Sequence, residues 1–483
     1  MEIVLLGLYT AALSVLFLFG IHSLVMVYYY VRTSRLPSPQ APPLQEFPMV
    51  TVQLPIYNEY YVVERLLRAV CAMEYPRDRL EIQVLDDSTD ETTELIARLV
   101  QHYRAQGIDI VHLRRNSREG YKAGALRYGL ERARGEFIAI FDADFVPRPD
   151  FLRKTLPYFA DPRVGMVQTR WEHLNEDYSL LTRAQALALD GHFALEQTTR
   201  NRAGFFINFN GTAGVWRRAC IEDAGNWHTD TLAEDLDLSY RAQLRGWKFV
   251  FLNNVTTPAE LPVDINALKS QQYRWTKGAV EVARKLLPLL WRSSLPLRIK
   301  LEATVHLTSN IVFPFILLVA VLNVPIVVLK NTLSGYDGYF TALSVFVLAA
   351  IGTFLFYLYA QRAIHWDWQR RLLFFPIFMA GSMGFAVNNT RAVIEALLGK
   401  RTEFVRTPKY NILRSGERWQ DKRYAPRRID PLVFAELLLA LYFAVGVGIS
   451  LYHAELAALP FQLLFLLGFG SIGLLSLQHA LQR

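Results

Sequence analysis

The sequence predicts an α/β domain combined with an α-helical transmembrane region. Hydrophobic residues make up 52% of the 483 residues, the mean hydropathy is +0.15, and the apolar residues gather in long uncharged blocks. After the first block, short β-rich runs alternate with amphipathic stretches. The length allows roughly two or three domains with a full core, which is enough for an enzyme.

Five blocks are long enough to cross a bilayer, for which a helix needs about 20 residues. They cover residues 3–31, 303–329, 340–361, 432–455 and 456–482. The first block is too long and begins too acidic for a signal peptide, so we expect it to remain as an anchor. A further uncharged stretch, residues 372–390, contains Pro376, Gly381 and an Asn388–Asn389 pair. We interpret it as re-entrant or interfacial.

Basic residues set the expected orientation, because Lys and Arg are enriched in cytoplasmic loops. Residues 400–428 contain ten Lys and Arg and three Asp and Glu, so this segment carries nearly all of the chain's formal net charge of +8. We expect this segment and residues 32–302 in the cytoplasm of a multi-pass protein of the inner or plasma membrane. Anionic lipid headgroups explain the basic charge, so no nucleic-acid partner is expected. Cys71 and Cys220 offer no disulfide framework and no metal cluster.

The α/β part begins after a proline-rich linker, residues 36–48. Strands are predicted over residues 49–56, 80–88, 108–115, 136–144 and 164–171, and helices over residues 59–73, 90–107 and 122–135. This alternation predicts a mostly parallel sheet with helices on both faces. In such sheets ligands bind at the carboxyl ends of strands, and the sequence places Tyr57, Asn58 and Glu59 at the first of these ends.

Two acidic motifs end predicted strands of this sheet. "DADF" offers Asp142 and Asp144, hard oxygen donors that suit Mg²⁺ or Mn²⁺ bridging the phosphates of a nucleotide. "DDSTD" offers Asp86 and Asp87. Each motif alone is as well explained by a solvated loop or a helix cap. Because both motifs stand at strand ends of one sheet, together they favour a nucleotide-diphosphate site.

Lys122 stands near the start of a predicted helix in "YKAGAL". It is either an ordinary exposed lysine or a cation that reaches a diphosphate with help from backbone amides. The sequence lacks the spacing of a P-loop, and no G-x-G-x-x-G follows the first strand. Kinase-like, ATPase and dinucleotide functions therefore lose their main support.

Two later motifs each have a structural and a functional interpretation. "TLAEDLDLSYRAQLRGW" carries Glu234, Asp235 and Asp237 at the head of a helix, where acidic residues favour stability or supply a base for an acceptor hydroxyl. "SQQYRW" ends at Trp275 and fits an interfacial helix with Arg and Trp at headgroup depth. Its tryptophan and Arg274 also suit a sugar ring and a phosphate.

In order, "DDS", "DAD", "AED" and "QQYRW" resemble the D, D, D, Q-x-x-R-W series of processive family 2 glycosyltransferases, the group that holds cellulose, chitin and hyaluronan synthases. Longer stretches, such as "VQTRWEHLN" and "FNGTAGVWR", look most like cellulose synthase-like mannan or glucomannan synthases and their bacterial relatives. The resemblance implies a Rossmann-like GT-A fold, a UDP-glucose or GDP-mannose donor, and Mg²⁺ or Mn²⁺.

The resemblance also implies roles for individual residues. Asp235 matches the general base, and Asp142 and Asp144 match the metal ligands. The residues implied for the nucleotide and diphosphate are Tyr57, Glu59, Asp86, Asp87, Lys122, Asp142, Gln271 and Arg274. Those implied for the acceptor are Glu234, Trp275, and Gly211 and Thr212 of "FNGTAGVWR". "FVRTPK" resembles the gating loop F-x-V-T-x-K through Phe404, Thr407 and Lys409, with Arg406 where that pattern has Val.

The implied reaction is an inverting transfer of a hexose to a growing β-linked polysaccharide, with β-1,4 linkage and coupling to export. A non-processive enzyme that glycosylates a lipid, of the glucosyl-diacylglycerol or glucosylceramide type, is the alternative. A transporter is disfavoured because the blocks carry almost no charge apart from Glu436 and Glu455. The predicted domains are residues 1–35, 36–300, 301–362, 363–430 and 431–483. The oligomeric state is not predicted.

Overall fold

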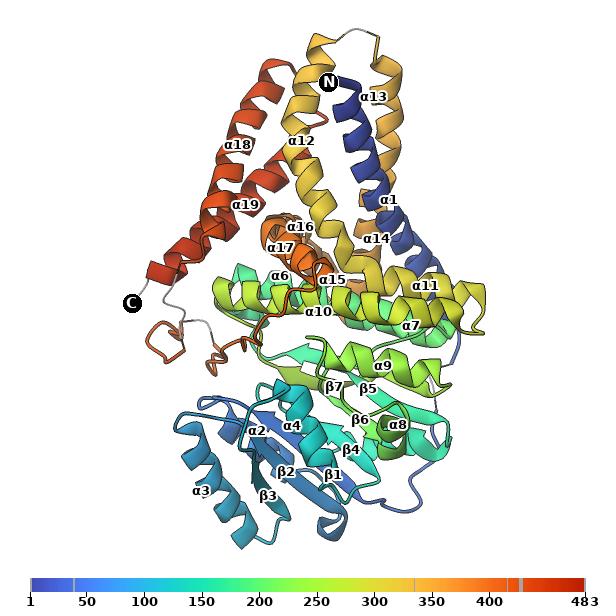
Figure 1. Ribbon diagram of the computed structural model, residues 1–483, viewed down its shortest axis with the longest axis vertical. Coiled ribbons are helices and arrows are strands. Elements are labelled where there is room, and N and C mark those ends of the chain that lie inside the picture. The colour runs from blue at the N-terminus through green and yellow to red at the C-terminus, as the bar shows by residue number, and fades with distance from the viewer. Residues whose placement is uncertain (1, 38–39, 334, 415, 425–428, 482–483) are drawn as a thin grey trace.

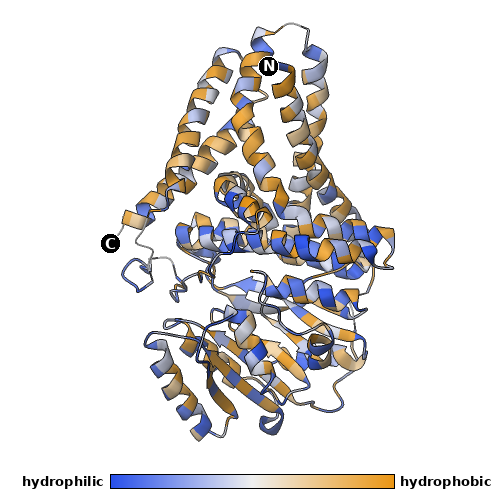
Figure 2. Cartoon of the chain, viewed as in Figure 1, coloured by the Kyte–Doolittle hydropathy of each residue, from blue (hydrophilic) through white to orange (hydrophobic). Residues whose placement is uncertain are grey.

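The computed structural model of the protein describes residues 2–37, 40–333, 335–414, 416–424 and 429–481. Ser415 and residues 425–428 of the predicted basic segment therefore lie outside the described part. An α/β domain carries a group of long helices on one side (Figure 1). The long helices are mostly apolar, whereas polar and apolar residues mix in the α/β domain (Figure 2).

The α/β domain is built on a seven-stranded sheet of order β3-β2-β1-β4-β6-β5-β7. Only β6 runs antiparallel to its neighbours, which are β4 and β5. The strands are β1 Val50–Ile56, β2 Leu80–Asp86, β3 Ile110–Arg114, β4 Phe137–Ile140, β5 Val164–His173, β6 Gly214–Arg217 and β7 Lys248–Ala259. The predicted mostly parallel sheet is confirmed, and β6 and β7 add two strands that the sequence did not predict.

Helices cover both faces of the sheet, as predicted. Alternate side chains of β1, from Val50 to Ile56, pack with α2, α3 and α5 on one face, whereas α4, α8 and α9 pack on the other. These helices are α2 Val63–Cys71, α3 Thr92–Ala105, α4 Tyr121–Leu130, α5 Phe151–Thr155, α8 Arg218–Asp223 and α9 Glu234–Leu244. Burial of the central strands from both sides explains their nearly continuous apolar sequences.

A second group of helices lies between the sheet and the long helices (Figure 1). It comprises α6 Leu180–Asp190, the π-helical turn η4 Gly191–Gln197, α7 Thr198–Ala203 and α10 Ile265–Arg292. Helix α10 starts at Asp264, whose carboxylate accepts hydrogen bonds from the backbone N–H groups of Asn266 and Ala267, each at 3.1 Å. Because α10 contacts α9 on one side and α17 and α19 on the other, it joins the α/β domain to the apolar helices.

Five helical segments are long and apolar enough to cross a membrane: Glu2–Thr33, Leu297–Thr332, Asp337–Ile364, Leu432–Tyr452 and Leu459–Leu481. They coincide with the five predicted blocks. The second begins earlier than the predicted residue 303, because α11 continues into α12. The remaining helices are α1 Glu2–Thr33, α11 Leu297–Thr308, α12 Val312–Thr332, α13 Asp337–Leu343, α14 Val347–Ile364, α15 Trp368–Leu372, α16 Phe375–Gly384, α17 Ala386–Leu397, α18 Leu432–Tyr452 and α19 Leu459–Leu481.

The stretch 372–390, predicted as re-entrant or interfacial, is broken. The segments Trp368–Gly384 and Ala386–Leu397 meet at a bend of 44°, and together they are apolar enough for a broken span or a re-entrant loop.

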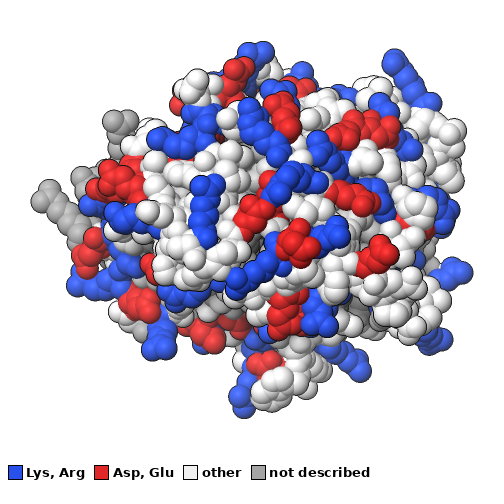
Figure 3. Space-filling view, turned by 90° about the horizontal axis from the view of Figure 1, so that it is seen from below, with Lys and Arg blue, Asp and Glu red and all other residues white. Residues whose placement is uncertain are grey.

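At the opposite end of the molecule, Lys and Arg side chains are interspersed with Asp and Glu over the face of the α/β domain (Figure 3). Mixed charge of this kind is typical of a solvent-exposed surface.

Candidate active site

One cavity of about 210 Å³ lies where the carboxyl ends of β1, β4 and β5 meet the starts of α9 and α10. It collects most residues that the sequence singled out, although they come from segments far apart in the chain. Those that line it are Tyr57, Glu59, Asp87, Lys122, Asp142, Asp144, Gly211, Glu234, Asp235, Gln271, Arg274, Trp275, Phe404, Thr407 and Lys409.

The loop after β4 presents two carboxylates to this cavity. Asp142 Oδ1 accepts a hydrogen bond from Lys122 Nζ at 2.5 Å, and the Asp142 backbone N–H donates to Thr212 Oγ1 at 2.9 Å. Asp144 Oδ2 lies 2.5 Å from Lys409 Nζ. Burial, and in addition the nearby charge of Asp144, raise the pKa of Asp142. Two carboxylates close together beside a cavity offer the hard oxygen ligands that Mg²⁺ and Mn²⁺ take. The pair fits a divalent metal ion.

Lys122 stands at the centre of the charged side chains. Its Nζ also donates to the Gly211 carbonyl at 2.9 Å. Burial opposes the charge on Lys122, but the carboxylate of Asp142 outweighs that effect and holds the lysine pKa above its ordinary value. The ammonium group is therefore available to neutralise a diphosphate.

Asp235, at the start of α9, faces the same space. Gly211 has a φ of +80°, and a Cβ added to it would lie 3.0 Å from Asp235 Oδ2 and 3.4 Å from Lys122 Nζ. Because glycine has no Cβ, it lets Asp235 and Lys122 come this close to the backbone of residue 211. Burial raises the pKa of Asp235 to about 7, and the charge of Glu234 adds to the effect. A carboxyl group that titrates near neutrality beside a cavity is suited to accept a proton.

Guanidinium and aromatic groups form the end of the cavity near β1 and β2. The Arg118 guanidinium carbon lies 3.4 Å from the centre of the Tyr57 ring and 5.0 Å from that of Tyr121. Arg115 binds both carboxylate oxygens of Asp87, with Nε 3.0 Å from Oδ1. Flat cationic and aromatic groups of this kind suit a nucleobase, which also presents a flat face.

Helix α10 presents Gln271, Arg274 and Trp275 to the cavity from one face, at the i, i+3 and i+4 spacing. Arg274 Nη2 donates to Thr407 Oγ1 at 2.7 Å, and its guanidinium lies 4.4 Å from the centre of the Phe404 ring. Burial lowers the pKa of Arg274 to about 10, so it stays cationic at neutral pH. The predicted gating-loop residues Phe404, Thr407 and Lys409 therefore line the cavity, and the first two contact Arg274 of α10.

Residues 48–278 match the family described as "Glycosyltransferase like family 2". Glucomannan 4-beta-mannosyltransferase 2 of Arabidopsis thaliana is 37% identical over 379 residues, which cover 75% of this chain and 68% of that protein. The protein belongs to glycosyltransferase family 2. Glucomannan 4-beta-mannosyltransferase 1 of Oryza sativa subsp. japonica is 34% identical over 420 residues, 83% of this chain and 77% of that protein.

A solved structure has the same fold as this family 2 glycosyltransferase. The mannosyltransferase PcManGT from Pyrobaculum calidifontis, in complex with GDP-Man and Mn²⁺, superposes with a TM-score of 0.58 at 21% identity. The match covers 82% of this chain and 100% of that one. The predicted GT-A fold and the assignment as a hexosyltransferase are confirmed.

Two residues predicted for the site, Asp86 and Thr212, do not line the cavity of the glycosyltransferase. Asp86 ends β2 and points the other way from Asp87, because successive side chains of a strand alternate. Its carboxylate accepts from the Ser88 backbone N–H and contacts His112 Nε2, both at 2.8 Å. Burial alone would raise the pKa of Asp86, but these hydrogen bonds lower it. Thr212 accepts a hydrogen bond from the backbone N–H of Asp142, so it supports a residue that lines the cavity.

Among the cavity-lining residues that received no role from the sequence are Arg118, Trp171, His173 and Asn210, although the last three lie in the quoted stretches "VQTRWEHLN" and "FNGTAGVWR". Trp171 and His173 stand at the carboxyl end of β5. A position at a strand end was also the signal that marked the acidic motifs. The same signal could have identified them. Arg118 lies in a loop, and nothing in its local sequence marks it.

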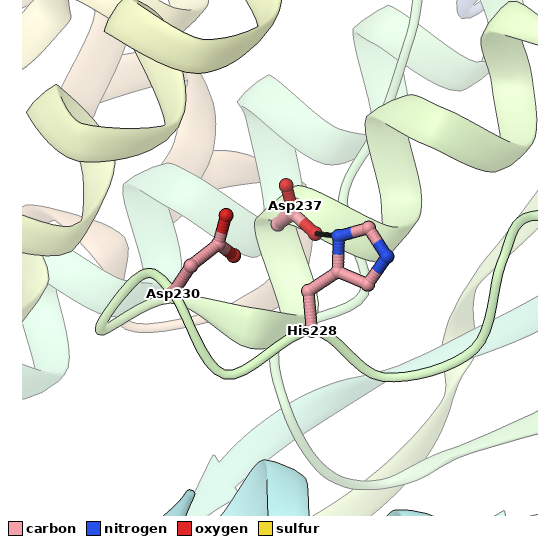
Figure 4. Close-up of side chains that lie close together, drawn as sticks. All are labelled: His228, Asp230 and Asp237. Atoms are coloured by element: carbon pink, nitrogen blue, oxygen red, sulfur yellow. Dashed lines mark ion pairs between the residues drawn. The ribbon is translucent and has the colours of Figure 1, made fainter.

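A group of metal-binding residue types lies outside the cavity, at His228, Asp230 and Asp237 (Figure 4). Lys285 Nζ lies 2.8 Å from Asp230 Oδ1, 2.9 Å from Asp237 Oδ1 and 2.9 Å from His228 Nδ1. The single ammonium group of Lys285 contacts all three side chains, and none of the three lines the cavity. The group is an ion-pair network that ties the segment before α9 to α10, and it helps to place Asp235.

Proposed function

We propose that the protein is an inverting, membrane-bound hexosyltransferase that extends a β-1,4-linked polysaccharide from a nucleotide-diphosphate sugar. The observation that carries this proposal is that Asp235, Lys122 and Trp275 share one cavity, with Asp235 and Lys122 converging on Gly211. A base, a cation for the diphosphate and a stacking surface for a sugar then lie together. The names of the relatives support mannosyl transfer, so GDP-mannose is the first donor to test and UDP-glucose the second.

In the proposed mechanism, Asp235 accepts the proton of an acceptor hydroxyl as the hydroxyl oxygen attacks the anomeric carbon of an α-linked donor sugar. The bond from that carbon to the diphosphate breaks, and a β-linkage forms. Lys122 and Arg274 balance the charge of the leaving diphosphate, and the buried cavity positions the reactants. Asp142 and Asp144 would hold Mg²⁺ or Mn²⁺, which when bound adds positive charge beside the diphosphate.

The proposed location places the catalytic domain, residues 36–300, in the cytoplasm, with residues 1–35, 301–362 and 431–483 in the membrane. The basic residues of the 363–430 segment support this orientation by their excess over acidic residues. Trp275 lies on α10, which runs directly beside the apolar helices. A polymer that leaves the cavity past Trp275 would therefore meet the membrane region, which supports coupling of synthesis to export.

The experiment that tests this function is product analysis. The purified full chain, in detergent with Mn²⁺, is incubated with radiolabelled GDP-mannose and, separately, with UDP-glucose. We expect an ethanol-insoluble product that a β-1,4-specific glycanase degrades. Label that extracts into organic solvent would instead identify a glycolipid transferase, and the absence of any transfer from either donor would contradict the proposal.

A further inference from the structure

Trp171 and His173 lie beside the cavity at the end of β5. They are two residues apart on a strand, so their side chains point to the same side of the sheet, and both line the cavity. The Trp171 ring is fixed between Phe145 and Phe193, with ring centres 5.1 and 5.0 Å away. The proposed mechanism uses neither residue.

Each of these side chains has one buried atom without a hydrogen-bond partner among the described residues: Nε1 of Trp171 and Nδ1 of His173. The His173 side chain is only 3% exposed. A buried polar atom without a partner is costly, and it is expected where a ligand or a water supplies the missing hydrogen bond.

Asp190 fixes which hydrogen bonds His173 can make. Asp190 Oδ1 lies 3.3 Å from His173 Nε2, and Asp190 Oδ2 accepts from Gln361 Nε2 at 3.0 Å and contacts His365 Nε2 at 2.9 Å. Because the carboxylate accepts, His173 Nε2 carries the proton and Nδ1 is left as an acceptor. The indole N–H of Trp171 is a donor. A hydroxyl group, which donates and accepts, has the chemistry that each of these atoms lacks.

The position of this pair separates it from the proposed nucleotide end. Strand β5 lies three places from β1 in the sheet, which is about 14 Å at the usual strand spacing. Tyr57 and Arg118 lie at the β1 end. Gln361 and His365, on the other side of Asp190, belong to α14 and the residue after it, at the end of a candidate span. The pair thus lies on the side of the cavity next to the apolar helices.

We propose that Trp171 and His173 form a subsite for a hydroxyl of the acceptor saccharide, and that Asp190 holds His173 in the binding orientation. The inference rests on the proposed function, because it names a contact of the same acceptor. Through Asp190, the subsite is joined to the end of α14, so the saccharide is held where it leaves the cavity toward the membrane region.

Two substitutions of His173 separate binding from a structural role. In His173→Asn the amide oxygen takes the place of Nδ1 and the contact with Asp190 is lost. In His173→Gln the amide reaches the position of Nε2 and keeps that contact, but the acceptor at Nδ1 is gone. Trp171→Phe removes the indole N–H and keeps the ring packing. The full-length variants are assayed for labelled polymer, total nucleotide release and donor KM, with the melting temperature as a check of folding.

We expect His173→Gln and Trp171→Phe to lower polymer formation about tenfold, the loss of one hydrogen bond, with nucleotide release by hydrolysis retained and donor KM unchanged. His173→Asn keeps the acceptor atom but loses the contact with Asp190 that orients it, so it should lose less polymer formation than His173→Gln. Activity in His173→Gln with loss in His173→Asn, equal loss of polymer and hydrolysis in all variants, or no effect in any of them would overturn the inference. Failure of the unmodified chain to make any saccharide would instead refute the proposed function.

Discussion

Lys122 Nζ lies 2.5 Å from Asp142 Oδ1, and this contact joins the start of α4 to the loop after β4. Because the ammonium also contacts Gly211, it lies beside both the proposed diphosphate position and the proposed base Asp235. It is the side chain best placed to receive the charge of the leaving group.

We therefore expect Lys122→Met to raise the donor KM about tenfold and to lower kcat by a factor of ten or more, since a charged contact to a diphosphate is lost. Steady-state kinetics with the labelled donor measure both constants. Lys154→Met is the matched control, because Lys154 pairs with Asp150 at the surface, away from the cavity. Equal effects of the two substitutions would contradict the assignment.

Asp235→Asn keeps the shape of the side chain but removes its ability to accept a proton. We expect transfer to fall at least a hundredfold, in line with the usual contribution of a general base, while nucleotide binding changes less than threefold. Calorimetric titration with the nucleoside diphosphate measures the binding. If the acidic start of α9 served helix stability alone, this variant would lose melting temperature and keep its turnover.

The pH dependence of the reaction should follow Asp235. Its pKa is raised to about 7 by burial and by Glu234, and the ionised form is the base. The value of kcat/KM should therefore rise tenfold per pH unit below about pH 7 and level off above it. Glu234→Gln removes a like charge, so the midpoint should move to lower pH even where the maximum rate falls. A midpoint that stays in place would exclude Asp235 as the titrating group.

The sequence predicts the parts of the sheet that have strong hydrophobic runs, and misses those that depend on tertiary contacts. Strand β6 has four residues and reverses direction between β4 and β5, so no local pattern announces it. Asp86 and Asp87 are adjacent in "DDS", yet strand alternation turns Asp86 toward His112 and away from the cavity. His173 stands at a strand end, as the acidic motifs do, but its contact with Asp190 depends on the fold and is not visible in the sequence.

Lys269 of α10 and Glu436 of α18 form a buried ion pair with 2.7 Å between Nζ and Oε1, and their side chains are 5% and 0% exposed. Removing one partner leaves an isolated charge, so Glu436→Leu should lower the unfolding free energy by about 3–5 kcal/mol. The double variant Lys269→Met with Glu436→Leu should recover most of that loss. Melting temperatures in detergent compare the three proteins. An additive loss in the double variant would show that the two charges do not interact.

Substitution of Trp275 tests whether the "SQQYRW" segment binds the acceptor sugar or serves only as part of a helix beside the membrane. Its side chain lines the cavity and is 40% exposed, as an acceptor platform must be in the absence of a saccharide. In Trp275→Ala we expect polymer formation to fall at least tenfold while donor hydrolysis persists, because a stacking surface for the acceptor is lost and the diphosphate contacts of Lys122 and Arg274 remain. Trp291→Ala is the matched control, since Trp291 lies on the same helix, is 46% exposed and does not line the cavity. Parallel loss of polymer and hydrolysis in Trp275→Ala, or equal behaviour of the two variants, would assign the tryptophan to the helix and not to the acceptor.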